Sequence, residues 1–282
     1  MAEIKDRILP VGIQSFEEIR KKGYLYVDKT DIIWQLANRG RKYNYLNRPR
    51  RFGKSVLVDT LQAYFEGRKE LFEGLKIMDL ETEWTKHPVI RLDMSRAGSS
   101  AHELNAYLNQ AFKEYEQKYN IETSPSDSLT NRFDAIIQSA YQQTGQQVVV
   151  LVEGYDSPLL NSWNTPHHEE CVSIYLNVFT ILKADDEYEE FVLITGTTKF
   201  TKLSLFSGLN NLSNISFEPE YAAICGITKE ELQNDFKPEI EKLADYENWT
   251  FDEAVAQLQA YYDGYHFSRK NMVDVFNPFS LI

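Results

Sequence analysis

The segment that most constrains this chain is Gly53-Lys54-Ser55, which stands between an apolar aromatic run and a helical pattern. The run covers residues 43–46, and residues 57–65 carry apolar side chains at the spacing of one helix face. Strand, tight loop, Gly-Lys-Ser and helix follow one another in the order that a phosphate-binding loop requires. The sequence therefore predicts an anion site where this loop enters its helix.

A helix that begins at this segment is a favourable place for an anion. The first backbone N–H groups of a helix have no partner within it, and the helix dipole adds positive potential at the same end. Lys54 would reach the outer phosphates of a nucleotide, and the Ser55 hydroxyl would coordinate Mg²⁺. We therefore expect a P-loop that binds ATP with Mg²⁺.

The loop departs from the usual pattern G-x-x-x-x-G-K-[ST], because Arg48 stands where the first glycine is expected. A side chain there can block the close approach of backbone to phosphate, but a guanidinium can also offer a planar pair of donors to the same anion. The alternative is a basic surface loop in front of an amphipathic helix. On the phosphate interpretation the nucleotide-binding residues are Arg48, Pro49, Arg50, Arg51, Phe52, Gly53, Lys54 and Ser55.

Composition places the chain among globular proteins. Its 282 residues, 43% of them hydrophobic, can bury a sizeable core as one large domain or as one domain with an appendage. No wholly apolar run is longer than residues 148–152, which is too short to span a bilayer. Two lone cysteines, Cys171 and Cys225, and a charged start without a following apolar segment predict a cytoplasmic protein.

Charge is distributed unevenly along the chain. Residues 1–55 hold 13 Lys and Arg against 6 Asp and Glu, whereas the remainder holds 17 against 36. The formal net charge of the whole chain is −12. An acidic surface with one basic loop favours a small polyanionic ligand over a long nucleic-acid backbone.

Short apolar strands alternate with helical patterns through most of the chain. We expect strands at residues 24–27, 43–46, 89–94, 147–153, 191–195 and 214–217. This alternation predicts an α/β fold, a P-loop NTPase three-layer sandwich with a mainly parallel sheet. From Thr228 the pattern is helical, so we expect an ATPase core with an N-terminal extension at 1–225 and a smaller helical, lid-like lobe at 226–282. The apolar end at 277–282 predicts that the natural protein continues.

Polar residues follow the predicted strands, at the edge where open α/β sheets bind their ligands. An ATPase needs a carboxylate there to hold Mg²⁺, so the predicted metal ligands are Ser55 and Glu153. Gly154 stands where a catalytic glutamate would follow, and Asp156 is the other nearby carboxylate. Thr195 fits a residue that senses the γ-phosphate or orients water. The predicted catalytic residues are Lys54, Glu153, Asp156 and Thr195.

Together these segments resemble the predicted AAA-ATPase-like family of bacterial proteins. The matching words are LPVGI at 9–13, YLYVDKT at 24–30, RPRRFGKS at 48–55, AYFEG at 63–67, YD at 155–156 with Pro158, TG at 195–196, FSGLNNL at 206–212, YDGYHF at 262–267 and NPFS at 277–280. The resemblance implies an ATPase half that usually precedes a lid and a restriction-endonuclease-like nuclease domain. It also makes Arg48 look like the family's own variant of the P-loop.

One departure from the family concerns the second carboxylate motif. The family typically reads Asp-Glu-Tyr-Asp where this chain reads Glu153-Gly154-Tyr155-Asp156. A glutamate can replace aspartate near Mg²⁺, but its extra methylene displaces the oxygen in a site that demands near-ideal octahedral geometry. The first hypothesis is therefore an ATP-binding, Mg²⁺-dependent module whose hydrolysis is weak or lost.

Two other functions remain open. One is a pseudo-ATPase, a nucleotide-sensing or scaffolding domain that regulates a nuclease or protein partner, and Gly154 favours it. The other is direct nucleic-acid binding by the arginines of the loop, with Tyr43 and Tyr45 stacking on bases. The acidic balance makes nucleic-acid binding the weakest of the three. The sequence names neither the cellular process nor the oligomeric state, nor an arginine finger from a neighbouring molecule.

Overall fold

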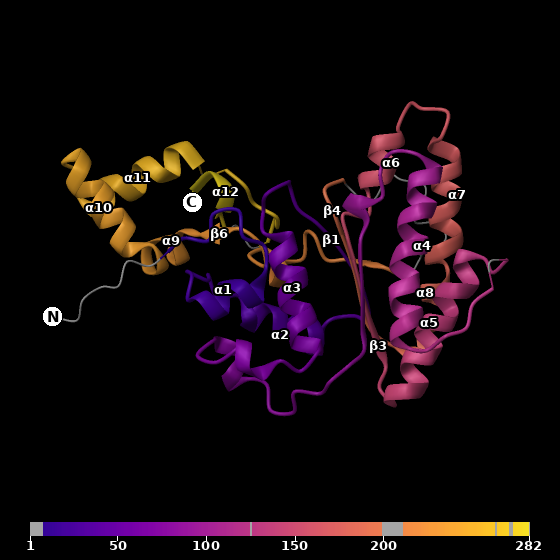
Figure 1. Cartoon of the computed structure of the whole chain (residues 1–282). Helices are drawn as coiled ribbons and strands as arrows, with labels where there is room; N and C mark the ends of the chain where they lie inside the picture. The colour runs from indigo at the N-terminus through magenta and orange to yellow at the C-terminus, as the bar shows by residue number, and fades with distance from the viewer. Residues whose placement is uncertain (1–7, 125, 199–210, 263, 271–272, 282) are drawn as a thin grey trace.

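The computed structural model describes residues 8–124, 126–198, 211–262, 264–270 and 273–281. Its centre is a five-stranded sheet in the order β2-β3-β4-β1-β5, and every pairing between neighbouring strands is parallel (Figure 1). The strands are β1 (Tyr43–Asn47), β2 (Val89–Asp93), β3 (Val148–Glu153), β4 (Glu189–Gly196) and β5 (Ser213–Asn214). The predicted α/β fold with a parallel sheet is therefore confirmed.

The apolar run of β3 crosses the middle of the molecule and is buried on both faces. Residues 148–152 have no exposed surface, and burial of each such side chain contributes roughly 1.5–3 kcal/mol to folding. Val148, Val150 and Val152 pack into one hydrophobic cluster, whereas Val149 and Leu151 pack into the other. Because side chains alternate along a strand, the residue that ends β3 belongs to the same face as Val149 and Leu151.

Helices cover both faces of the sheet (Figure 1). One layer contains α1 (Phe16–Lys22), α2 (Thr30–Arg39) and α3 (Lys54–Phe65). The other contains α4 (Ala101–Lys118), α5 (Leu129–Thr144), α7 (His168–Phe179) and α8 (Ile181–Ala184). The connections include α6 (Ser157–Ser162) and the short 3₁₀ helices η1 (Lys69–Leu71), η2 (Lys76–Asp79), η3 (Met94–Arg96), η4 (Asp186–Tyr188) and η7 (Pro219–Tyr221).

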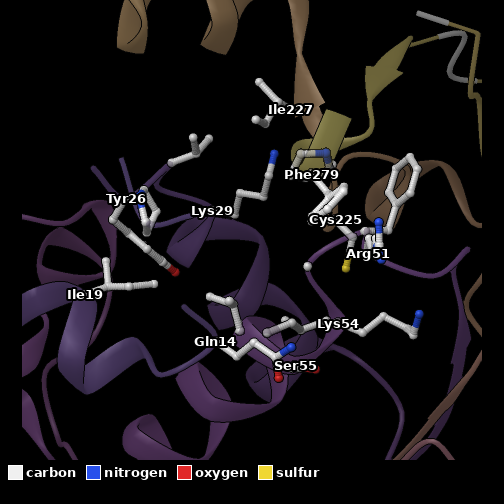
Figure 2. A pocket seen from close by; sticks show the side chains of 18 of the residues that line it. Gln14, Ile19, Tyr26, Lys29, Arg51, Lys54, Ser55, Cys225, Ile227 and Phe279 are labelled. Atoms are coloured by element: carbon white, nitrogen blue, oxygen red, sulfur yellow. The ribbon is translucent and has the colours of Figure 1, made fainter. Parts of the chain in front are cut away.

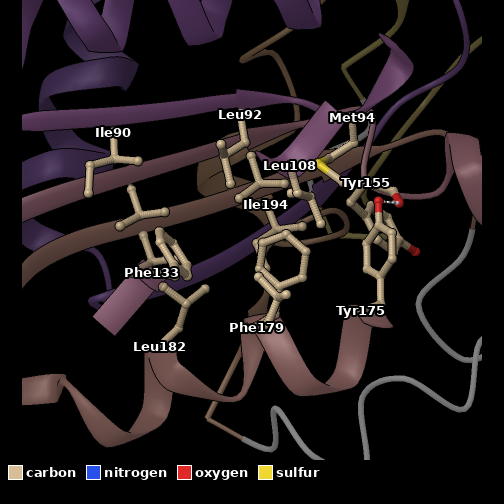
Figure 3. Packing of buried hydrophobic residues seen from close by; sticks show 14 of the residues in the cluster. Ile90, Leu92, Met94, Leu108, Phe133, Tyr155, Tyr175, Phe179, Leu182 and Ile194 are labelled. Atoms are coloured by element: carbon tan, nitrogen blue, oxygen red, sulfur yellow. Dashed lines mark hydrogen bonds between the residues drawn. The ribbon is translucent and has the colours of Figure 1, made fainter. Parts of the chain in front are cut away.

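The layer of α4, α5 and α7 fixes the chain that follows β3. Phe112 and Phe133 stack with ring centroids 5.2 Å apart. Phe133 belongs to a cluster that reaches Ile90, Leu92 and Ile194 of the sheet (Figure 3). At the end of this cluster the Tyr175 hydroxyl donates to the carbonyl of Tyr155 at 2.6 Å (Figure 3). A packed aromatic layer thereby holds the backbone at the carboxyl end of β3.

Local capping explains where the early helices begin and end. Ser15 accepts a hydrogen bond from the backbone of Glu18 at the start of α1, and Gly23 ends the helix in the left-handed conformation. The predicted strand at residues 24–27 is wrong. The Leu25 amide bonds the carbonyl of Ile8, and its side chain packs with the C-terminal helices, so this segment joins no sheet.

The last part of the chain is mainly helical, as predicted. It contains β6 (Ile227–Thr228), α9 (Lys229–Asp235), α10 (Lys237–Glu247), α11 (Phe251–Tyr262), β7 (Val275–Phe276) and α12 (Pro278–Leu281). Thr228 and Glu231 form the capping box that their spacing predicts. The antiparallel pairing of β6 with β7 was not predicted, and the strand expected at 214–217 is reduced to β5.

Some predicted features lie outside the described residues: positions 206–210 of the FSGLNNL motif, Asp263 and Ile282. Among the residues that are described, no helix has both the length and the apolar surface that crossing a membrane requires.

Candidate nucleotide site

The loop between β1 and α3 has the backbone of an anion-binding turn. Gly53 stands immediately before the helix with φ 87° and ψ 12°, a left-handed conformation that favours glycine. Arg51 also has a positive φ, of 64°. No side chain of the described residues caps α3, so its first N–H groups remain directed out of the helix end. The backbone at this terminus is therefore open, in the conformation that the predicted anion site requires.

The Lys54 side chain folds back over the loop that precedes it. Its Nζ donates to the carbonyl oxygens of Arg48 and Pro49, at 2.8 Å each. Burial lowers the pKa of Lys54, and nearby Asp156 and Glu153 act against that shift. An ammonium has three donors, so two bonds to the loop leave one for a phosphate oxygen.

Ser55 and Glu153 come together across 98 residues of sequence. The Ser55 hydroxyl donates to Glu153 Oε1, which joins the first turn of α3 to the end of β3. Glu153 faces α3 because it continues the face of Val149 and Leu151. A hydroxyl and a carboxylate are the protein ligands that Mg²⁺ takes beside nucleotide phosphates. The two residues predicted as metal ligands are thus in direct contact.

Arg91 is a member of this site that the sequence interpretation missed. Its Nη2 lies 3.1 Å from Glu153 Oε2, and its Nη1 lies 2.7 Å from Asp59 Oδ1 on α3. Burial opposes the charge of Arg91, yet the carboxylates of Asp59 and Glu153 raise its pKa. A signal was present in the sequence, because Arg91 is a charge inside the otherwise apolar strand 89–92.

Asp156 braces the ends of two strands. It is buried, and its Oδ2 accepts hydrogen bonds from the backbone N–H and the hydroxyl of both Thr197 and Thr198, at 2.6–2.9 Å. The predicted catalytic carboxylate is therefore occupied with the chain that leaves β4. This contact joins the segment after β3 to the segment after β4.

Thr195 lies on β4, the strand between β1 and β3. It pairs in register with Leu46 of β1, and its side chain is fully buried. Among the described residues its Oγ1 has no hydrogen-bond partner. Alternation along β4 puts it on the face of Phe191 and Leu193, toward α3.

Gly154, in the second carboxylate motif, has a backbone conformation that is unfavourable for a residue with a side chain. Gly154 has φ 61°, and a Cβ added there would lie 3.3 Å from the backbone nitrogen of Ser95 and from Ser157 Oγ. A left-handed conformation costs a non-glycine residue roughly 1–2 kcal/mol. Restoring a glutamate at this position therefore requires local rearrangement, which the sequence alone does not reveal.

Arg48 has a different role from the anion-binding fork that the sequence suggested. The side chain is fully buried, and its guanidinium donates to the carbonyls of Ser216 and Tyr221, each at 2.8 Å, and to that of Asn47 at 2.9 Å. Burial lowers the pKa of Arg48 to about 10. Carbonyl oxygens thus accept from both terminal nitrogens of the guanidinium, so the side chain anchors the loop from within the protein.

The remaining loop residues divide into anchored and exposed groups. Phe52 is fully buried, with ring centroids 4.9 Å from Tyr265 and 5.4 Å from Phe267. Arg50 and Arg51 are exposed, and the Arg51 guanidinium lies 3.8 Å from the ring centre of Phe279. The loop therefore contacts the C-terminal part of the chain through several rings.

The suggested stacking of nucleic-acid bases on two tyrosines is wrong. Tyr45 has no exposed surface and Tyr43 is buried, because both belong to β1 and pack into the core beneath α4 and α5. The Tyr43 hydroxyl bonds Glu189 at 2.7 Å, at the opposite end of the strand from the loop. Neither ring is accessible to a base.

A cavity of about 310 Å³ opens beside the start of α3 (Figure 2). Its walls come from residues 10–14, from several residues between 19 and 33, from residues 51–57, from residues 224–227 with Phe236, and from the C-terminal pair Pro278 and Phe279. Most of this lining is apolar. Figure 2 shows Ser55 at one end and Lys29 with Ile227 toward the other. The sequence interpretation missed this cavity, because its walls come from distant segments.

Lys29 closes part of the cavity wall by an ion pair. Its Nζ contacts both carboxylate oxygens of Glu231, at 2.7 and 2.8 Å, and both side chains are largely buried. Glu231 is also the capping residue of α9. The N-terminal segment and the C-terminal helices are therefore joined next to the loop.

The five-stranded parallel sheet with flanking helices, and the loop that enters α3 through Gly53, define an AAA-like P-loop domain. Residues 10–206 match the family described as Predicted AAA-ATPase. Because this match covers more than half of the chain, the chain belongs to that family. The family suggests a P-loop ATPase-like module that binds nucleotide.

The chain is also similar to a longer bacterial protein. It is 36% identical over 278 residues to the "Uncharacterized protein in vnfD 5'region" of Azotobacter chroococcum mcd 1. The alignment covers 97% of this chain and 51% of that protein, so the chain spans about half of its relative's length.

Proposed function

We propose that this chain is an ATP-binding module that takes its nucleotide with Mg²⁺ and hydrolyses it weakly. The observation that carries the proposal is the contact of Ser55 with Glu153 at the uncapped start of α3. A metal that bridges nucleotide phosphates needs an oxygen donor from the P-loop and a carboxylate from a neighbouring strand. Both groups lie at one helix end, where the dipole favours the same anion.

Each part of the site has a role in this proposal. The N–H groups of residues 50–55 would cradle the phosphates, with Lys54 giving its third donor to the outer one. The apolar cavity beside α3 would hold the base, since ligand pockets bury most of a ligand against apolar walls. Thr195 would sense the outer phosphate. Residues 226–282 would act as a lid, because they contribute cavity wall at Gly226, Ile227 and Phe279.

The proposal is tested by the binding of a fluorescent ATP analogue with Mg²⁺ and with a chelator. The expected result is tighter binding with Mg²⁺, and loss of that difference in Ser55→Ala and Glu153→Gln. Ser173→Ala, on a different helix, is the control and should keep the parent behaviour. Equal binding with and without Mg²⁺ in the parent would contradict the assigned metal site.

A pseudo-ATPase is the second candidate, and the backbone of Gly154 favours it. A glutamate that activates water cannot be added there without strain, and Asp156 is occupied with Thr197 and Thr198. On this alternative, nucleotide binding would change the position of the lid and so regulate a partner protein or domain. Phosphate release separates the two candidates. If the parent chain is a weak ATPase, it releases phosphate faster than the Glu153→Gln variant. If it is a pseudo-ATPase, it binds ATP but releases phosphate no faster than that variant.

A further inference from the structure

We propose that Arg91 is a positioning residue for the metal-binding carboxylate of Glu153. This inference rests on the proposed function, because it concerns how the same site presents its carboxylate to Mg²⁺. Arg91 Nη2 lies 3.1 Å from Glu153 Oε2, while Ser55 holds Oε1. One carboxylate oxygen of Glu153, Oε2, thus contacts the arginine, while the other, Oε1, faces the proposed metal position beside Ser55.

The contact with Arg91 offsets the extra flexibility that a glutamate has at this position. Glutamate has one more rotatable bond than aspartate, so its carboxylate can occupy more positions at the end of β3. Magnesium demands oxygens close to octahedral positions. By holding Oε2, Arg91 restricts the rotation of the Glu153 side chain and leaves Oε1 directed at Ser55. The longer side chain is then usable in place of an aspartate.

Arg91 can position another residue because it is itself held from a second side. Its Nη1 contacts Asp59 Oδ1 at 2.7 Å and Gln62 Oε1 at 3.1 Å. Asp59 is fixed in turn by the backbone N–H of Phe16, which donates to its Oδ2 at 2.6 Å. A guanidinium is a rigid planar fork, so the two contacts that hold Nη1 also set the direction in which Nη2 points toward Glu153.

One face of α3 carries both the metal ligand and the anchors of the arginine. Ser55, Asp59 and Gln62 are spaced by four and three residues, which places them in a row along the helix. Across from this row lie Arg91 of β2 and Glu153 of β3, on neighbouring parallel strands. One row of polar contacts between α3 and the sheet therefore runs beside their apolar contact and ends at the start of the helix.

A purely electrostatic role makes the opposite prediction. If Arg91 acted only through its charge, it would repel Mg²⁺, so a neutral replacement would strengthen metal binding and a lysine would leave it unchanged. Positioning depends on the fork, and a lysine lacks one. Two results therefore distinguish the two roles. One is whether Arg91→Gln weakens or strengthens Mg²⁺ binding, and the other is whether Arg91→Lys changes Mg²⁺ binding at all.

The experiment is a Mg²⁺ titration of fluorescent-ATP binding to the full chain. Positioning predicts that Arg91→Lys and Arg91→Gln raise the half-saturating Mg²⁺ concentration about tenfold, the usual cost of losing a group that orients a metal ligand. Affinity for the nucleotide in chelator should stay within about twofold of the parent, because phosphate contacts are unchanged. That split between metal and nucleotide affinity would not arise from a general loss of structure.

The matched control is Arg132→Lys. Arg132 forms a similar buried pair with Glu116, at 2.6 Å, in the helical layer on the other face of the sheet. It should leave the Mg²⁺ midpoint unchanged. An unchanged midpoint in Arg91→Lys, or tighter Mg²⁺ in Arg91→Gln, would overturn the inference. If Arg91→Gln does not fold, Arg91→Lys decides alone. Absence of nucleotide binding by the parent would instead overturn the proposed function and this inference with it.

Discussion

The guanidinium of Arg48 lies 4.0 Å from the centre of the Phe267 ring, so the start of the phosphate-binding loop is anchored on the C-terminal part of the chain. The same group donates to two carbonyls that are 168 and 173 residues away in sequence. Where the usual P-loop pattern has a glycine, this chain has a buried cation. Contacts of Arg48 with Phe267 and with the carbonyls of Ser216 and Tyr221 thus hold the start of the loop.

Replacing Arg48 by the glycine of the usual pattern should therefore damage the protein. Arg48→Gly removes charge-assisted hydrogen bonds and leaves the carbonyls of Ser216 and Tyr221 buried without their donors. We expect a loss of roughly 3 kcal/mol in the free energy of unfolding, measured by urea denaturation. Arg50→Gly, an exposed arginine of the same loop, is the control and should cost far less. Equal stability of Arg48→Gly and the parent would refute the anchoring role.

Stability should depend on pH through two carboxyl groups at the opposite edge of the sheet, Glu189 and Asp185. Burial raises the pKa of Glu189 to about 8, and burial with nearby Asp134 raises that of Asp185 to about 7. Both groups are therefore more easily protonated in the folded chain than in the unfolded one. Their stabilising contribution is complete below about pH 4, the usual carboxyl pKa, and is lost as pH rises through 7 and 8.

The variant Glu189→Gln tests this dependence, because it keeps the shape of the protonated group. The Tyr43 hydroxyl can still donate to the amide oxygen, as it does to Glu189 Oε2. The variant should gain roughly 2–4 kcal/mol over the parent at alkaline pH and little at acidic pH. Glu190→Gln, on the opposite face of β4, is the control. Identical pH profiles for Glu189→Gln and the parent would exclude this source of pH dependence.

The pair of Lys29 with Glu231 should stabilise the contact between the C-terminal helices and the cavity wall. Lys29→Met leaves a largely buried carboxylate without its cation, which should cost roughly 3 kcal/mol. Adding Glu231→Gln to the Lys29→Met variant should recover part of that loss, since the amide oxygen of the glutamine can still accept from the backbone N–H of Thr228. A double-mutant cycle by chemical denaturation gives the coupling. Additive losses would show that the two side chains do not act as a pair.

Much of the fold could be predicted because its signals are local. The buried runs at 148–152 and 191–195, the caps at Ser15 and Thr228, and the order of strand, loop and helix are all present in short stretches of sequence. Parallel strands then bring their carboxyl ends to one edge, so the meeting of Ser55 with Glu153 could be anticipated. Local pattern failed at residues 24–27, where tertiary packing decides the conformation.

The rest of the site depends on partners that no local pattern reveals. Arg48 contributes an anchor only because the carbonyls of Ser216 and Tyr221 come to it from distant segments. Arg91 is visible as a charge in an apolar strand, but its two carboxylate partners come from α3 and β3. Alternation of side chains along β2 could have placed Arg91 on the α3 face. The cavity beside α3 depends on several segments that lie far apart in the sequence, and it could not be inferred.

The most direct test of the account is a calorimetric titration of ATP with Mg²⁺ into the parent chain and Lys54→Ala. Lys42→Ala, which alters a lysine that bonds the carbonyl of Asp186 away from the loop, is the control. We predict saturable binding by the parent and by Lys42→Ala, and binding weaker by about tenfold or more in Lys54→Ala, which loses a charge-assisted phosphate contact. Equal affinity of Lys54→Ala and the parent would contradict the claim that this loop binds the nucleotide.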